Sequence, residues 1–289
     1  MTTLPPFELH RPASVEEAST LLEQLGDEAV VYSGGTELLL VMKMGLAEYA
    51  HLVDVKGIAE LRRLDASNGV LEVGAAVTHR EVERSPAVQE RWAGLATMER
   101  GVGNLRVRTM GTIGGNLCFA DPHSDPAAFL LAAGGTLVCR RGGRPPREVP
   151  VESFVEGPYR TALEPGELLT AVRVPAPPQA TGIAHEKMSL YERPAVTVTC
   201  LVRLDGGVLA DVRLAVGSVG NRPFRAGDAE AALAGAASDK LDGVLASAAE
   251  AAAAQSDPVE DANGSVEYKR QLVRVLTKRC VHNAVQRAT

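Results

Sequence analysis

Two short segments with adjacent glycines constrain this chain more than any other feature of its sequence. The first is Ser33-Gly34-Gly35-Thr36-Glu37, and the second is Gly111-Thr112-Ile113-Gly114-Gly115-Asn116. Adjacent glycines let successive backbone N–H groups point the same way, and such a nest binds anions, more strongly when a helix begins beside it. Either segment alone is better explained as a tight turn, but together they predict a site for a ligand with two phosphates.

The familiar catalytic spacings are absent from the sequence. There is no G-x-S-x-G, no H-E-x-x-H, no Walker loop and no Rossmann G-x-G-x-x-G. The cysteines, at positions 118, 139, 200 and 280, are too far apart to form a zinc ribbon or to hold an iron–sulfur cluster. We interpret His51 and His185 as structural, because each lies beside an apolar run, and His123 as a weaker candidate near a ligand. We therefore predict no catalytic residue and no metal site on this chain.

Composition excludes several functional classes. The net charge of −6, from 30 basic and 36 acidic side chains, argues against nucleic-acid binding, and so does an aromatic content of 4%. The longest apolar stretches are far shorter than the ~20 residues that span a membrane. The first ten residues lack the pattern of a signal peptide, so we expect a cytoplasmic protein.

The hydrophobic pattern predicts an α+β fold of two domains, as a length of 289 residues also suggests. In the first half, helices are expected at 15–25, 37–44 and 125–133, and strands at 29–32, 51–55, 70–77, 136–139 and 171–174. Residues 101–125 are predicted to form an irregular, glycine-rich segment, and the proline-rich segment 174–182 a linker. In the second half, strands are expected at 185–189, 195–204 and 208–217, with helices at 229–233, 240–254 and 268–284. The alanine-rich helix is expected to pack on the sheet.

Longer motifs around the two glycine segments resemble a known family. Residues Tyr32 to Leu39 and Thr112 to Asp125 are similar to the paired FAD loops of the molybdenum hydroxylases. The chain resembles their separate FAD-binding (medium) subunit, of the carbon monoxide dehydrogenase and xanthine dehydrogenase type, over nearly its whole length. The resemblance implies a two-lobed FAD-binding domain at residues 1–176, with FAD between two small α/β lobes. It implies a C-terminal domain at 180–285, an antiparallel sheet covered by helices.

The resemblance also assigns the cofactor-binding residues. The pyrophosphate and ribityl side of FAD would be lined by Val31, Tyr32, Ser33, Gly34, Gly35, Thr36 and Glu37, and the other side of the pyrophosphate by Thr112, Ile113, Gly114, Gly115 and Asn116. Asp125 would hold a hydroxyl group of the flavin chain, although it could equally cap the helix that begins before Pro126. Lys187 would lie near the isoalloxazine ring, with Val102 and Leu169 packed beside it.

The implied function is electron transfer within a larger complex. Substrate would be oxidised at a molybdenum cofactor on a large subunit, and electrons would cross [2Fe-2S] clusters on a small subunit to FAD on this chain and then to an external acceptor. The complex would be a dimer of heterotrimers. A stand-alone FAD-dependent NAD(P)H reductase and a flavin-free assembly scaffold remain alternatives. The chain departs from the family pattern at Pro194, where an aspartate is usual, and at Thr109, where an asparagine is usual after Arg108.

Overall fold

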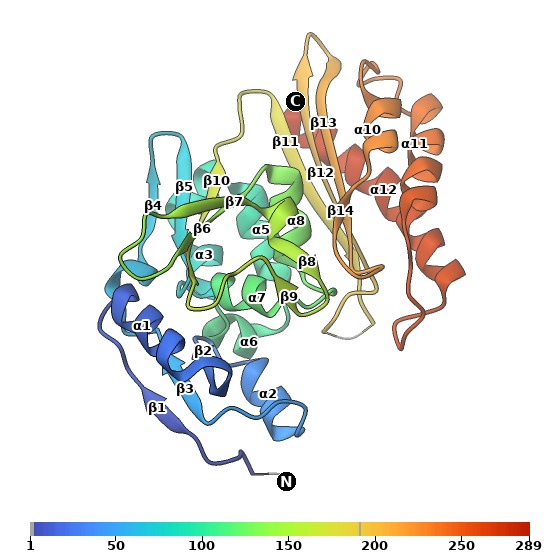
Figure 1. Cartoon of the computed structure of the whole chain (residues 1–289). Helices are drawn as coiled ribbons and strands as arrows, with labels where there is room; N and C mark the ends of the chain where they lie inside the picture. Colours follow the sequence, from blue (N-terminus) through green and yellow to red (C-terminus); the bar gives the residue numbers. More distant parts are fainter. Residues whose placement is uncertain (1–2, 191) are drawn as a thin grey trace.

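Three main β-sheets organise this computed structural model, which describes residues 3–190 and 192–289 (Figure 1). The first sheet has three parallel strands, the second five antiparallel strands and the third four antiparallel strands. Each is covered by helices, which confirms the predicted α+β class. No helix among the described residues is long and apolar enough to cross a membrane.

The N-terminal lobe is built on the order β1-β3-β2. It comprises β1 (Glu8–His10), α1 (Val15–Leu25), β2 (Ala29–Tyr32), α2 (Leu38–Lys43) and β3 (His51–Asp54). Helix α1 begins where expected, because the Ser14 hydroxyl accepts a hydrogen bond from the Glu17 amide. Its apolar face packs on β2 and β3. Strand β2 ends at Tyr32, and the first glycine segment follows directly at Ser33.

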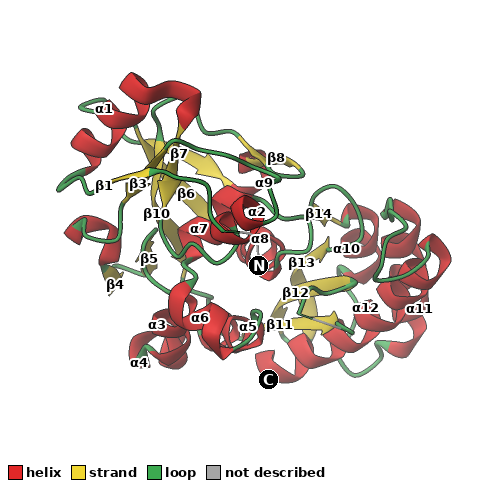
Figure 2. Ribbon diagram, turned by 90° about the horizontal axis from the view of Figure 1, so that it is seen from below, coloured by secondary structure: helices red, strands yellow, loops and turns green. Residues whose placement is uncertain are grey.

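The second lobe is built on the order β4-β5-β10-β6-β7. Its strands are β4 (Leu64–Ser67), β5 (Val70–Gly74), β6 (Thr136–Arg140), β7 (Arg147–Pro150) and β10 (Leu168–Pro175), with a small hairpin of β8 (Val155–Gly157) and β9 (Arg160–Thr161). Its helices are α3 (His79–Arg84), α4 (Pro86–Arg91), α5 (Ala93–Gly101), α6 (Leu105–Met110), α7 (Ile113–Phe119), α8 (Asp125–Ala133) and α9 (Val151–Phe154). Figure 2 shows α3 to α6 gathered at one end of this lobe.

The C-terminal part is an antiparallel sheet in the order β11-β12-β13-β14. It comprises β11 (Thr181–Met188), β12 (Val196–Asp205), β13 (Val208–Gly217), β14 (Phe224–Arg225), α10 (Gly227–Leu233), α11 (Asp242–Gln255) and α12 (Val266–Ala288). Gly206 and Gly207 form the turn between β12 and β13, and both glycines have positive φ, as a tight hairpin requires. Helix α12 packs on β11 and β12.

Helix α8 joins the two halves of the molecule. All nine of its residues are buried, and it packs against β12 and β13 on one side and against α5 and β10 on the other. A helix that is apolar all round must be buried all round, which explains the Ala-Ala-Phe-Leu-Leu-Ala-Ala sequence. Its N-terminal residue, Asp125, therefore lies where the C-terminal sheet meets the second lobe.

Two predictions of local structure are wrong. Residues 101–125 are not irregular, because α6 and α7 form within them: Asn104 caps α6 and Thr112 caps α7, each through its side-chain oxygen. The alanine-rich helix α11 packs mainly on α10 and α12 rather than on the sheet. Its small side chains allow close helix–helix approach, and α12 occupies the face of the sheet instead.

Candidate functional site

The two glycine segments lie against each other. A Cβ atom at Gly34 would be 2.4 Å from the Met110 carbonyl oxygen and 2.6 Å from the Gly111 Cα, so only glycine permits this approach. The Ser33 and Thr112 hydroxyls are 3.1 Å apart and share a hydrogen bond. Segments separated by almost eighty residues thus meet at the border between the two lobes, as their pairing in the sequence predicts.

The first segment offers free backbone donors. Among the described residues, the amides of Gly34, Gly35, Thr36 and Glu37 make no hydrogen bond to another part of the chain. Gly35 has a φ of +71°, a left-handed conformation that favours glycine and occurs in anion-binding nests. This is the arrangement expected of an anion-binding nest. It also lies at the start of α2, although α2 is short.

A lysine that the sequence did not single out supports this loop. The Lys56 ammonium donates to the Ser33 carbonyl at 3.2 Å, pairs with Asp54 at 2.8 Å and lies 3.6 Å from the centre of the Tyr32 ring. The Tyr32 ring in turn closes the space beside Gly35, since a Cβ there would be 2.4 Å from it. Tyr32 and Lys56 therefore hold the loop in this conformation.

The second segment differs from expectation. It is not a loop, because Ile113, Gly114, Gly115 and Asn116 form the first turn of α7, and their amides already have acceptors within the chain. The Gly114 amide, for example, donates to the Ala75 carbonyl at 3.1 Å, and a Cβ at Gly114 would be 2.5 Å from that oxygen. Gly114 is thus needed for packing against Ala75, the residue directly after β5, and the second segment does not form a second nest.

Asp125 lies at the centre of a buried polar cluster. It is 4% exposed, and its carboxylate accepts hydrogen bonds from His185 at 3.1 Å and from the Lys187 ammonium at 2.8 Å. The alternative role as helix cap is wrong, because Ser124 is the capping position and the Asp125 side chain points to β11. Burial alone would raise the pKa of Asp125, but the hydrogen bond to His185 and the charge of Lys187 outweigh it, so the pKa is lowered.

Lys187 connects this cluster to α5. Its ammonium donates to the Gly101 carbonyl at 2.7 Å as well as to Asp125, and a third N–H remains for another acceptor. The adjacent Val102 is 5% exposed and belongs to the same hydrophobic cluster as Leu169 in β10. Val31 is half-buried in β2, next to the first glycine segment.

Further hydrogen bonds link the two regions. The Ser124 hydroxyl donates to the side-chain oxygen of Asn116 at 2.5 Å, immediately before Asp125. Separate hydrogen bonds therefore connect the predicted residues: Ser33 contacts Thr112, Asn116 contacts Ser124, and the next residue, Asp125, contacts Lys187.

Residues 192–193 of the C-terminal part contact both lobes near these residues. Arg193, between β11 and β12, pairs with Glu37 at 2.9 Å and with Asp121 at 3.2 Å. The neighbouring Glu192 accepts a hydrogen bond from Asn104, the cap of α6. Pro194, where the family usually has an aspartate, thus directly follows two residues, Glu192 and Arg193, that together contact both lobes.

Sequence reasoning missed Arg193, and it did not connect His185 with Asp125. His185 fits the structural interpretation, because both of its ring nitrogens have partners: Nε2 contacts Asp125, and Nδ1 lies 2.8 Å from the Thr199 hydroxyl. Its position two residues before Lys187 on one strand was the available signal, because such residues share a face. His123 lies 3.0 Å from Asp261 and 3.3 Å from Asp121, and so joins the second lobe to the C-terminal part.

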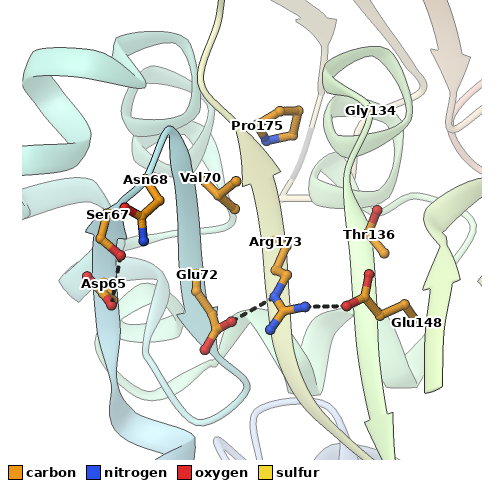
Figure 3. Close-up of a pocket in the computed structure, with 10 residues that line it drawn as sticks. All are labelled: Asp65, Ser67, Asn68, Val70, Glu72, Gly134, Thr136, Glu148, Arg173 and Pro175. Carbon is orange, nitrogen blue, oxygen red and sulfur yellow. Dashed lines mark hydrogen bonds and ion pairs between the residues drawn. The ribbon is translucent and has the colours of Figure 1, made fainter. Parts of the chain in front are cut away.

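A separate hollow of about 520 Å³ lies on the outer face of the five-stranded sheet (Figure 3). Its charged groups satisfy one another: Arg173 pairs with Glu72 at 2.7 Å and also with Glu148, and Ser67 donates to Asp65. None of the predicted site residues lines it. The hollow is therefore distinct from the site between the lobes.

Comparison with known protein families places both parts of the chain. Residues 5–177 match the family described as the FAD binding domain in molybdopterin dehydrogenase. Residues 191–284 match the family described as the CO dehydrogenase flavoprotein C-terminal domain. Together the two families account for nearly all of the sequence.

Individual relatives agree with these matches. The chain is 35% identical to the carbon monoxide dehydrogenase medium chain of Hydrogenophaga pseudoflava over 282 residues, covering 97% of each protein. It is 31% identical to the nicotine 6-hydroxylase medium subunit of Paenarthrobacter nicotinovorans, covering 97% of this chain and 98% of that one. The solved structure of the Hydrogenophaga pseudoflava carbon monoxide dehydrogenase that lacks the Mo-pyranopterin moiety superimposes with a TM-score of 0.96, covering 99% of this chain and 100% of that one at 35% identity.

Proposed function

Because this chain belongs to the family of FAD-binding medium subunits of molybdenum hydroxylases, we propose that it passes electrons from an iron–sulfur partner to an external acceptor. The chain is an oxidoreductase subunit whose cofactor is FAD. FAD supplies the redox chemistry, and the protein holds it and tunes it. The observation that carries the proposal is the contact between the two glycine segments at Ser33 and Thr112.

The residues between the lobes fit a dinucleotide. The free amides of Gly34 to Glu37 are donors for the pyrophosphate, and Thr112 supplies a hydroxyl from the opposite side. The resemblance of the motifs to the family extends this surface to Val31, Tyr32 and Ser33 and to the α7 residues Ile113 to Asn116. We propose that the α7 residues contribute shape rather than amide donors, since their amides are already bonded.

The buried cluster fits the flavin end of the cofactor. We propose that Lys187 directs its remaining N–H toward the isoalloxazine ring, with Val102 and Leu169 packed beside the ring. The carboxylate of Asp125 is already engaged with Lys187 and His185, so its main role in this proposal is to position Lys187. A contact of Asp125 with a flavin-chain hydroxyl would use a remaining lone pair. Because the cofactor carries the redox chemistry, this proposal assigns no acid or base catalyst among the residues of this chain.

We propose that the partners are an iron–sulfur small subunit and a molybdenum-binding large subunit, assembled as a dimer of heterotrimers in the cytoplasm. Exposed apolar side chains lie on or directly after the two short helices that flank the glycine segments: Leu40 on α2, Met44 directly after α2, and Leu105 and Met110 on α6. Isolated exposed apolar residues are common, but a group beside a redox site suits a partner that delivers electrons. We also propose that the two domains divide at residues 176–180, between β10 and β11.

Purification of the native complex tests this function. We expect the chain to co-purify with two subunits that carry iron and molybdenum, and to show the absorbance of oxidised flavin. Rapid reduction of the isolated chain by NAD(P)H, without partners, would instead support a stand-alone reductase. A folded, colourless chain that takes up no added FAD would support an assembly scaffold.

A further inference from the structure

Three possible metal ligands meet at the edge of the N-terminal sheet, away from the glycine segments. They are Glu8 and His10 on β1 and His51 at the start of β3. The Nε2 atom of His10 is 3.1 Å from Nδ1 of His51, and Glu8 Oε2 is 3.6 Å from His51 Nδ1 and 4.0 Å from His10 Nε2. The sequence conceals this group, because more than forty residues separate the histidines.

The backbone fixes this arrangement. Strands β1 and β3 are parallel, with Glu8 directly opposite His51. Glu8 and His10 are two residues apart on β1 and therefore share one face of the sheet. Both imidazole side chains are about four-fifths buried, at 18% and 20% exposure. The two rings thus have little freedom, whereas Glu8 can adjust at the surface.

The donor set and its dimensions suit a transition metal. A single ion can reach all three donor atoms at about 2.1 Å, the usual zinc–nitrogen and zinc–oxygen distance. Two imidazoles and one carboxylate are ligands for zinc or copper rather than for calcium or magnesium, which prefer oxygen alone. Three protein ligands also leave a fourth position for water.

We propose that Glu8, His10 and His51 form a zinc site that fastens the edge strand β1 to β3. Strand β1 has only three residues and pairs on one side alone, so a metal joining it to β3 would hold the N-terminal segment in place. The site is independent of FAD, because its ligands lie on strands β1 and β3, while the glycine segment follows β2.

Zinc titration of the full chain tests this proposal. The protein is purified without a histidine tag, dialysed with Zn²⁺, and its zinc content is measured by mass spectrometry. We expect one zinc per chain in the wild type and its loss in His51→Gln. We also expect Co²⁺ to give a visible d–d absorption band in the wild type only. The variant His282→Gln removes a histidine that is 48% exposed and lies outside the group, and it should bind zinc like the wild type.

Glu8→Gln provides a second measurement. Glu8 is 67% exposed, so its replacement should not disturb folding, yet it should weaken zinc binding by more than about tenfold. If His51→Gln unfolds, the Glu8→Gln titration decides the question. Equal zinc uptake by the wild type and Glu8→Gln, or no saturable uptake by the wild type, would overturn the proposal.

Discussion

Replacing Gly34 with alanine should weaken FAD binding while leaving the chain folded. The added Cβ would be 2.4 Å from the Met110 carbonyl oxygen and 2.6 Å from the Gly111 Cα. Ordinary contacts of a Cβ begin near 3.4 Å, so the two glycine segments would have to separate by roughly 1 Å. Both obstacles are backbone atoms, and no flexible side chain can move aside.

The size of the effect follows from this geometry. Overpacking of a well-packed contact costs about 1–3 kcal/mol, and rigid neighbours favour the upper end. If the whole cost appears in cofactor binding, ~3 kcal/mol corresponds to an FAD affinity roughly 150-fold lower. The contact of Gly34 with Met110 and Gly111 lies at the border between the lobes, and none of these three residues belongs to a hydrophobic cluster, so we expect the loss to fall on FAD more than on folding.

The assay compares FAD affinity with thermal stability. Apo-protein is titrated with FAD, and binding is followed by flavin fluorescence, while circular dichroism records the unfolding temperature. Gly57→Ala is the matched control, because nothing lies within 4 Å of its added Cβ. Wild-type FAD affinity in a folded Gly34→Ala variant would refute the assignment of this contact to the cofactor site. Gly114 is a poorer choice, since its Cβ would strike Ala75 and disturb packing in the second lobe.

Three further changes test the polar contacts around the site. The pKa of Asp125 is lowered on folding, so its contribution to stability is present above the unfolded value of ~3.9 and is lost as pH falls through the folded pKa. Asp125→Asn should cost about 3 kcal/mol at neutral pH and flatten the acid limb of urea-unfolding stability; an unchanged acid limb would contradict this. The pKa of His123 is raised by Asp121, so its contribution is full below ~6.5 and is lost as pH rises through the folded pKa. In His123→Gln the decline in unfolding free energy above ~6.5 should disappear, and its persistence would exclude His123 as the source. Arg193→Ala should change stability by less than about 1 kcal/mol but speed FAD release in stopped-flow measurements, and an unchanged release rate would show that the turn does not retain the cofactor.

Local patterns predicted much of the fold. Strand β2, helix α1 and the hairpin at Gly206-Gly207 follow from apolar runs, a capping serine and paired glycines. Helix α7 was missed because glycine has low helix propensity and α7 begins with two glycines in its first turn. Packing against Ala75 overrides that propensity at Gly114.

The site was predictable only in part, for a related reason. The glycine segments were visible because each is continuous in the sequence. The contacts of Asp125 with His185 and Lys187 join residues about sixty positions apart, so they depend on how α8 packs against the C-terminal sheet. Arg193 likewise acts through a turn whose position only the assembled fold defines.

The balance of charge at the site indicates how the diphosphate of FAD is held. Lys56 is paired with Asp54 and Lys187 with Asp125, so each of these ammonium groups already faces a carboxylate. Arg193 contacts two carboxylates, and that group carries a net negative charge. Side-chain cations therefore leave little positive charge for the phosphates. The free amides of the first glycine segment have no such partner, and they must provide most of the attraction for the phosphates.

The same pairing of charges limits the effect of Lys187 on the flavin. At a distance, the buried Asp125 carboxylate largely cancels the electrostatic field of the Lys187 ammonium. Only a direct N–H contact from Lys187 would therefore distinguish the reduced cofactor from the oxidised one.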